Sequence, residues 1–118
     1  MTYYVVAHLR EVRPHEEILV YIERMQSTLD PFGGRFLTHG MDVEVIEGDW
    51  PGHLVMVGFP DETSAKAWYA SDAYQEILPM RTNHIDGDLV MIQGVDPDYD
   101  AAATAEGMRA SGFTSAGR

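Results

Sequence analysis

Histidine, tyrosine and carboxylate side chains are the groups through which this chain of 118 residues could do acid–base chemistry, because it contains no cysteine. His8 lies in the apolar run Tyr3–Leu9, where an imidazole would be kept neutral and could act as a general base near neutral pH. The phenol of Tyr74 could donate to a substrate oxygen. We therefore take His8 and Tyr74 as candidate catalytic residues. The alternatives are a buried histidine with its hydrogen bonds satisfied and a tyrosine bonded to a backbone carbonyl.

Arg35 and Arg81 are the candidate anion-binding residues. The chain has 8 basic and 19 acidic side chains, giving a net charge of −11, so cations are scarce. A guanidinium can bind a carboxylate or a phosphate through two parallel hydrogen bonds. The alternative is that each arginine pairs with one of the many local carboxylates. Gly33 and Gly34, directly before Arg35, predict a tight turn from a helix into a strand.

Trp50, Trp68 and Ser71 are further candidates for contact with a ligand. Trp50 lies in a polar turn, where it would either cover an aromatic ligand or fill the end of the fold or a subunit interface. Trp68 is expected to face the sheet from a helix, and a place in the core explains it equally well. Ser71 is equally explained as a helix cap.

Neither a metal nor a cofactor is predicted. The five histidines lack the spacing of a metal-binding motif such as His-Glu-x-x-His, and there is no P-loop, dinucleotide-binding fingerprint or nucleophile turn. The acidic charge argues against nucleic acid and anionic membranes as partners. A strand-like start without a signal-peptide pattern, and no apolar stretch of about 20 residues, predict a soluble cytoplasmic protein.

The elements that must position these residues follow from apolar spacing and turn residues. The expected elements, in chain order, are a strand at Tyr3–Leu9, a helix from Pro14 to Leu29, extended arms at Arg35–His39 and Met41–Glu47, a strand at His53–Phe59, helices capped by Asp61 and by Ser71, and a strand at Leu89–Gln93. Pro79 is expected to end or kink the last helix. The order βαββαβ predicts an α+β, ferredoxin-like sandwich over residues 1–95.

Residues 96–118 differ from this domain in being rich in Ala, Gly and Ser. Composition predicts a disordered C-terminal tail, with a short Ala-rich helix from Tyr99 to Ala110 as the alternative. In the domain itself, helices would cover one face of the antiparallel sheet, so apolar residues on the other face need a cover. A second copy packed sheet against sheet would supply it, and we expect a homodimer that buries roughly 1,600 Å² or more.

Four segments, in this order, carry a resemblance to a known family: Gly33-Gly34-Arg35, Glu47-Gly48-Asp49-Trp50, Phe59-Pro60 and Trp68-Tyr69-x-Ser71-x-x-Tyr74. The chain resembles the bacterial domain of unknown function 1330, within the dimeric α+β barrel superfamily, over roughly residues 3–95. Tyr21 and Arg81 also fall at matching positions. The resemblance implies the fold and the dimer. By analogy with the superfamily, it also implies cofactor-free monooxygenases, isomerases, cyclases or decarboxylases acting on small organic molecules, alongside haem enzymes.

The leading interpretation is a cofactor-independent enzyme, cyclase-, isomerase- or monooxygenase-like, acting on an apolar or aromatic substrate by His/Tyr acid–base chemistry. One alternative is a non-catalytic module that binds a small carboxylated metabolite through Arg35 and Arg81, and another is a dimeric scaffold. A closed cavity holding a perturbed histidine or tyrosine would favour the enzyme. An open cleft lined by both arginines would favour the binding module, and a solid core would favour the scaffold.

Overall fold

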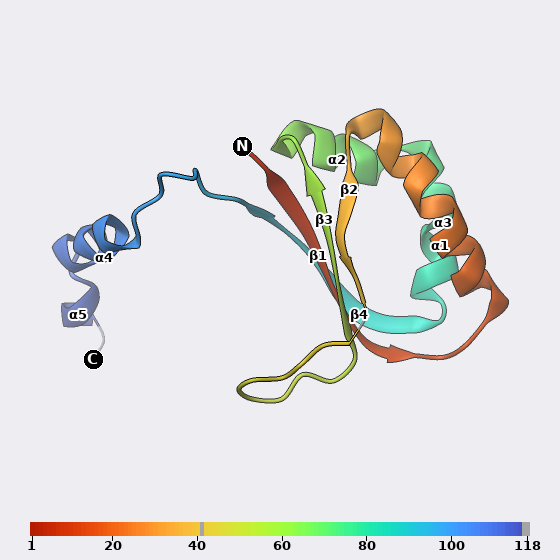
Figure 1. The fold of residues 1–118 in the computed structure, drawn as a ribbon, viewed down its shortest axis with the longest axis horizontal. Coiled ribbons are helices and arrows are strands. Elements are labelled where there is room, and N and C mark those ends of the chain that lie inside the picture. Colours follow the sequence, from red (N-terminus) through yellow and green to blue (C-terminus); the bar gives the residue numbers. More distant parts are fainter. Residues whose placement is uncertain (41, 117–118) are drawn as a thin grey trace.

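The computed structural model describes residues 1–40 and 42–116. Its elements are β1 (Tyr3–Val12), α1 (Glu16–Leu29), a 3₁₀ turn (Asp30–Phe32), β2 (Arg35–His39), β3 (His53–Phe59), α2 (Glu62–Ala70), α3 (Asp72–Thr82), β4 (Ile85–Gln93), α4 (Ala101–Ala110) and α5 (Phe113–Ala116). The strands form one antiparallel sheet in the order β2-β3-β1-β4. Helices α1, α2 and α3 cover one face of this sheet (Figure 1). The predicted α+β ferredoxin-like order is therefore confirmed.

Alternation along β1 decides which side chains reach the core. Val5 and Ala7 are buried under the helices, whereas Val6 and His8 point to the other face of the sheet. The residues of the central core come from the sheet and from all three helices: Val5, Met25, Leu29, Val57, Phe59, Ala65, Trp68, Tyr74 and Ile77. The indole nitrogen of Trp68 donates to Thr28 Oγ1 at 3.0 Å, so this large side chain is buried with its polar atom satisfied.

The turn between α1 and β2 is built on two glycines, as the sequence predicts. Gly33 has a φ of 72°, a left-handed conformation that side chains strain. A Cβ added at Gly34 would lie 2.6 Å from the ring of Phe59 and 2.9 Å from Leu29. The second glycine therefore lets the start of β2 approach the core closely.

One predicted element is wrong, and of the two outcomes predicted at Pro79, an end or a kink of the helix, the end is not observed. The extended arm expected at Met41–Glu47 is absent from 42–47, and Met41 lies outside the described residues. Residues 42–47 instead belong to the loop that joins β2 to β3. Pro79 does not end α3, which runs on to Thr82. Apolar packing on both sides of the proline, by the buried Ile77 and by Met80 against the core, stabilises the helix against the loss of one hydrogen bond.

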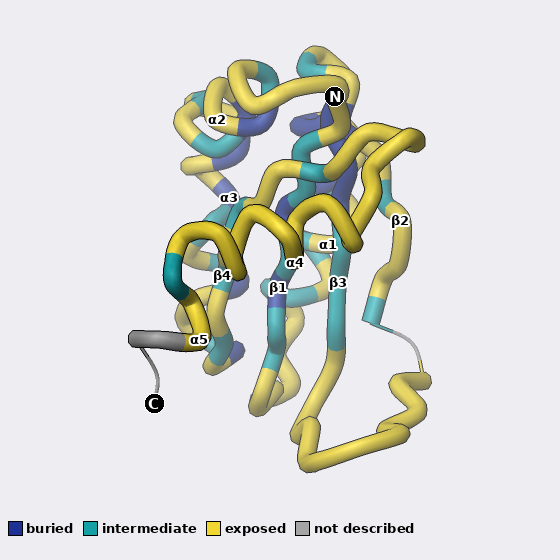
Figure 2. Tube along the Cα trace, turned by 90° about the vertical axis from the view of Figure 1, so that its left-hand side faces the viewer, coloured by how far each residue is buried: buried dark blue, intermediate teal, exposed yellow. Residues whose placement is uncertain are grey.

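The tail contains a helix where composition predicts disorder. The carboxylate of Asp100 caps α4 by accepting from the backbone N–H of Ala102 at 3.0 Å, and the alanines that follow favour a helix. This helix lies within the alternative span Tyr99–Ala110. The tail leaves the end of β4 and carries α4 away from the body of the domain, on the side of the uncovered sheet face (Figures 1 and 2). Among the described residues, no helix has the length and apolar character required to span a membrane.

Candidate functional site

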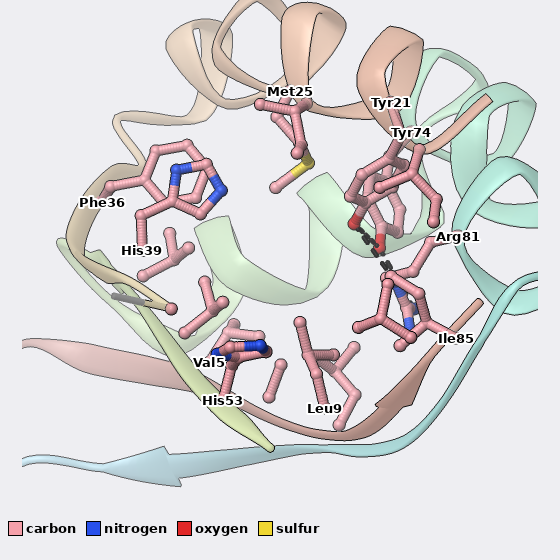
Figure 3. Close-up of a pocket in the computed structure, with 18 of the residues that line it drawn as sticks. Val5, Leu9, Tyr21, Met25, Phe36, His39, His53, Tyr74, Arg81 and Ile85 are labelled. Carbon is pink, nitrogen blue, oxygen red and sulfur yellow. Dashed lines mark hydrogen bonds between the residues drawn. The ribbon is translucent and has the colours of Figure 1, made fainter. Parts of the chain in front are cut away.

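A cavity of about 230 Å³ lies between the helix-covered face of the sheet and helices α1 and α3 (Figure 3). Val5 and Leu9 of β1 lie on one side of it, and Met25 of α1 lies on the other. Its lining is almost entirely apolar. Polar groups enter it in two places, a tyrosine–arginine cluster and a pair of histidines.

The first polar group is a cluster of Tyr21 from α1 with Tyr74 and Arg81 from α3. The two hydroxyls are hydrogen bonded at 2.9 Å. Arg81 Nε donates to the Tyr21 hydroxyl at 3.3 Å, and Nη2 donates to the Tyr74 hydroxyl at 3.5 Å. Each hydroxyl carries one hydrogen, and the bond between the two phenols uses only one of them. The cluster therefore keeps one hydroxyl hydrogen for a further acceptor.

Arg81 is a buried cation without an acidic partner. Its residue is 8% exposed. Within the part of the chain that the structure describes, no carboxylate lies within 4.0 Å of its guanidinium. By contrast, Arg10, Arg24 and Arg109 each pair with one carboxylate and Arg13 pairs with two. A buried charge is costly unless it is paired, so this end of the cavity favours a ligand with negative charge.

The charge states of the cluster follow from burial and from mutual contact. Burial by itself lowers the pKa of Arg81, but the phenol oxygens of Tyr74 and Tyr21 outweigh it and raise that pKa above its ordinary value. Burial, reinforced by the nearby Tyr74, raises the pKa of Tyr21 well above its ordinary value. At neutral pH Arg81 is therefore cationic and Tyr21 is a neutral phenol.

Besides the cavity, Arg81 borders a shallow outer cleft, which is also lined by Glu11 and Asp86. These two carboxylates lie 3.5 and 3.1 Å from Arg13, which occupies them instead of Arg81. Bonding to Arg13 lowers the pKa of Asp86. Because both carboxylates of the outer cleft pair with Arg13, neither of them neutralises the charge of Arg81.

Local sequence explains how α3 presents its two cluster residues. The hydroxyl of Ser71 accepts from the backbone N–H of Tyr74 at 3.2 Å and so fixes the first turn of the helix. Arg81 follows Tyr74 by seven residues, which is two turns, so both side chains lie on one face. Trp68 packs against the Tyr74 ring with centroids 4.1 Å apart.

The second polar group consists of His39 at the end of β2 and His53 at the start of β3. Figure 3 places both imidazoles across the cavity from the tyrosine–arginine cluster. The ring of His39 stacks on Phe36 with centroids 4.4 Å apart. The cavity therefore brings two imidazoles and a cationic hydroxyl cluster to opposite sides of one apolar volume.

The predicted pair His8 and Tyr74 is not brought together. His8 points to the uncovered face of the sheet, where its ring stacks on Trp50 with centroids 3.9 Å apart. Its Nε2 is 2.7 Å from the carbonyl oxygen of Pro51. Neither His8 nor Trp50 lines the cavity.

The other predicted binding residues separate in the same way. Arg35 is exposed and in register with Gly58, on the face of the sheet that the helices do not cover. Arg35 and Arg81 therefore do not line one cleft. Trp68 and Arg81 line the cavity. Ser71 acts on the cavity only through its cap of α3.

Sequence reasoning missed Tyr21 as a partner of Tyr74, and it considered His39 and His53 only as metal ligands. A signal existed for Tyr21, because it lies three and four residues from Ile18 and Met25 on the apolar stripe of its helix, where a phenol needs a polar partner. No such signal exists for the histidines. Their approach depends on the pairing of β2 with β3.

Comparisons with known proteins identify the family and the fold. The model of the family described as Domain of unknown function (DUF1330) matches residues 2–95. No curated protein sequence matches the chain. A solved protein of unknown function from Rhodopseudomonas palustris is similar at a TM-score of 0.64 and 14% identity, covering 81% of this chain and 84% of its own.

Two further solved structures share the fold. A dimeric ferredoxin-like protein of unknown function from a Jannaschia species has a TM-score of 0.57 and 12% identity, covering 80% of this chain and 100% of its own. SnoaB, a cofactor-independent oxygenase from Streptomyces nogalater, has a TM-score of 0.56 and 10% identity, covering 84% of this chain and 97% of its own. At such low identity the likeness extends to the fold alone.

Proposed function

Since the chain belongs to the family described as Domain of unknown function (DUF1330), we propose a function from its own cavity. The protein is a small-molecule enzyme that needs no bound cofactor. It takes a mostly apolar substrate, aromatic or similar in shape, that carries one oxygen able to bear negative charge. Its reaction is proton transfer at a carbon beside that oxygen-bearing group, the step common to isomerases and cyclases.

The observation that carries this proposal is the unpaired, buried Arg81 at one end of an otherwise apolar cavity. Fixed donors aimed at the place where negative charge develops stabilise a transition state more than its ground state. Arg81 supplies the positive charge, and the Tyr21–Tyr74 pair supplies one free hydroxyl hydrogen. Together they suit the oxygen of an enolate.

The proton-transfer step assigns a role to each side of the cavity. A substrate carbonyl oxygen accepts from the free phenol hydrogen and from Arg81. The imidazole of His39 or His53 takes the proton of the adjacent carbon, the C–H electron pair forms the enolate double bond, and the carbonyl π electrons move to the oxygen. Return of the proton to the oxygen, or to another carbon where a further double bond is conjugated with the enolate, completes an isomerisation. Attack by the enolate carbon on a second carbonyl of the same substrate completes a cyclisation, in which the new alkoxide oxygen takes the proton back from the imidazolium.

The volume of the cavity limits the substrate. An apolar cavity of about 150 Å³ accepts benzene, and pockets for drug-sized ligands start at about 300 Å³. At about 230 Å³ the cavity suits a single aromatic ring with a short substituent.

A second candidate function rests on the same arginine. Because the described residues offer its guanidinium two hydroxyls as hydrogen-bond partners and no carboxylate, the cavity would equally hold a small aromatic carboxylate without turning it over. In this case the protein is a non-catalytic module that binds a small carboxylated metabolite through Arg81 and without Arg35. An assay for substrate turnover distinguishes the enzyme from the binding module.

The test is exchange of the carbon-bound proton in D₂O, followed by NMR for a panel of aryl ketones and arylpyruvates. We expect the wild type to accelerate exchange for at least one member and the Tyr74→Phe and Arg81→Met variants to lose at least about 100-fold of that rate, the range of a lost oxyanion donor. Arg35→Gln, on the far face, is the matched control and should retain the rate. Tight binding of the panel without exchange would favour the binding module instead.

A further inference from the structure

We propose that His15, Glu17 and His84 form a binding site for Zn²⁺ or a similar transition-metal ion. One ligand atom from each of the three side chains lies within 4.8 Å of the others. His15 and Glu17 belong to the start of α1, and His84 lies in the turn between α3 and β4. The site is separate from the cavity and does not rest on the proposed function.

Direct contacts already bring the three side chains together. His84 Nε2 is 2.8 Å from Glu17 Oε1. The rings of His15 and His84 stack with centroids 3.9 Å apart and planes inclined by 11°. His15 Nδ1 accepts from the backbone N–H of Glu17 at 3.0 Å, so Nε2 carries the ring hydrogen. An ion bound at Nε2 would move that hydrogen to Nδ1 and replace the bond to the backbone.

The ligand set fits zinc. Two imidazoles and one carboxylate are the protein ligands of many zinc enzymes, and ligand atoms about 2.05 Å from a tetrahedral ion are about 3.3 Å apart. Closing the present separations to that value requires the stacked rings to tilt toward each other. The exposed ring of His15 makes this movement by giving up its bond to the backbone N–H of Glu17, whereas the His84 side chain, 18% exposed, is held by its contact with Glu17.

The surrounding charge favours a cation. The chain carries a net charge of −11. Arg13, two residues before His15, directs its guanidinium to Glu11, to Asp86 and to the carbonyl of Asn83. The nearest positive side chain along the sequence is therefore already neutralised by its own carboxylate partners.

The position of the site indicates what the ion would do. Ile18 and Ile85, which follow Glu17 and His84 directly, line the cavity, while the three ligands lie outside its lining. An ion would join the start of α1 to the end of α3, the two helices that carry Tyr21, Tyr74 and Arg81. It would act as a structural clip on the wall of the cavity rather than as a participant in its chemistry.

The test is isothermal titration of the purified, chelator-treated protein with ZnCl₂, repeated with CoCl₂ and with MgCl₂. We expect one saturable Zn²⁺ site, a weaker Co²⁺ site and no Mg²⁺ binding, because Mg²⁺ prefers oxygen ligands. Glu17→Gln and His84→Gln should each weaken Zn²⁺ binding by about tenfold or more. His15→Asn should do so while keeping a side-chain oxygen to cap the helix.

Two controls make the result decisive. Glu16→Gln removes the same charge one residue away and should leave the affinity unchanged. His53→Gln removes an imidazole of the cavity and should also have no effect. If Zn²⁺ binding survives Glu17→Gln and His84→Gln, or is lost in His53→Gln alone, the proposed site is wrong. Thermal denaturation of each variant without metal confirms that a lost affinity does not reflect an unfolded protein.

Discussion

At the scale of single residues, the most informative side chain is Arg81, because it is a buried cation that pairs with no carboxylate of the described residues. Its only polar side-chain partners among the described residues are the hydroxyls of Tyr21 and Tyr74, which already bond each other. The sequence predicts Arg81 as an anion-binding residue and Tyr74 as a catalytic residue, but it does not predict that the two side chains are in contact. Seven residues of helix join them, whereas their link to Tyr21 depends on the packing of α1 against α3, which no spacing along the chain reveals.

A binding role for Arg81 predicts that the protein without ligand does not depend on it for stability. Arg81→Met keeps most of the volume and removes an unpaired buried charge, so the free energy of unfolding should fall by no more than about 1 kcal/mol, or rise. Ile77→Ala, a truncation on the same helix, should cost about 2–5 kcal/mol. Urea denaturation measures both. A loss in Arg81→Met as large as that in Ile77→Ala would mean that the arginine is structural.

Tyr21 gives the cluster a signature at alkaline pH. Burial keeps its pKa above the ordinary value of 10.0 in the folded protein. Above that pH the unfolded chain releases the proton while the folded protein retains it, so folding stability is complete below about pH 10 and falls as the pH rises beyond it. The contribution of Tyr21 approaches about 1.4 kcal/mol per pH unit. Urea denaturation at pH 9 and 10.5 should show a smaller loss in Tyr21→Phe than in the wild type; equal losses would contradict the assigned burial.

At the scale of elements, apolar spacing and turn residues are enough to predict βαββαβ, but not which extended segments pair. Residues 42–47 alternate as well as a true strand, yet they lie in the loop between β2 and β3 and pair with no described strand. Cap residues are more reliable, because they act on their own helix. Ser71 illustrates this, since its cap fixes the register that carries Tyr74 and Arg81 to the cavity.

Removal of the cap tests this positioning. Ser71→Ala should lower the free energy of unfolding by about 1 kcal/mol, because the backbone N–H of Tyr74 loses its acceptor. Ser27→Ala, on the exposed side of α1, should change it by less than about 0.5 kcal/mol. Thermal or urea denaturation gives both values. If the two substitutions cost the same, the cap does not determine the start of α3.

At the scale of the whole molecule, one face of the sheet is covered by no helix of the described residues, and only the loop around Trp50 packs on part of it. Val90 and Ile92 of β4 are 55% and 58% exposed on this face, in register with Val6 and Tyr4 of β1. The described part of the tail leaves them exposed, and it contributes to a radius of gyration of 17.5 Å, against about 13.5 Å for a compact chain of this length. Apolar exposure of this kind is typical of an interface between subunits, and we propose that a second copy packs on it.

The proposed dimer predicts a sedimentation coefficient that depends on this face alone. The wild type at micromolar concentration should sediment as a dimer, and Val90→Lys with Ile92→Lys should sediment as a folded monomer, because the two charges would be buried unpaired. Circular dichroism checks that the variant is folded. A wild type that remains monomeric in the ultracentrifuge would exclude the dimer.

The central claim is that the cavity binds an anionic oxygen through Arg81, and paired ligands test it most directly. Isothermal titration compares small aromatic carboxylates with their neutral amides, which have nearly the same shape, in the wild type and in Arg81→Met. We expect the wild type to prefer the carboxylate by about tenfold or more, which is about 1.4 kcal/mol, and Arg81→Met to lose that preference. Equal affinity for both ligands in the wild type, or a preference that survives Arg81→Met, would contradict the claim.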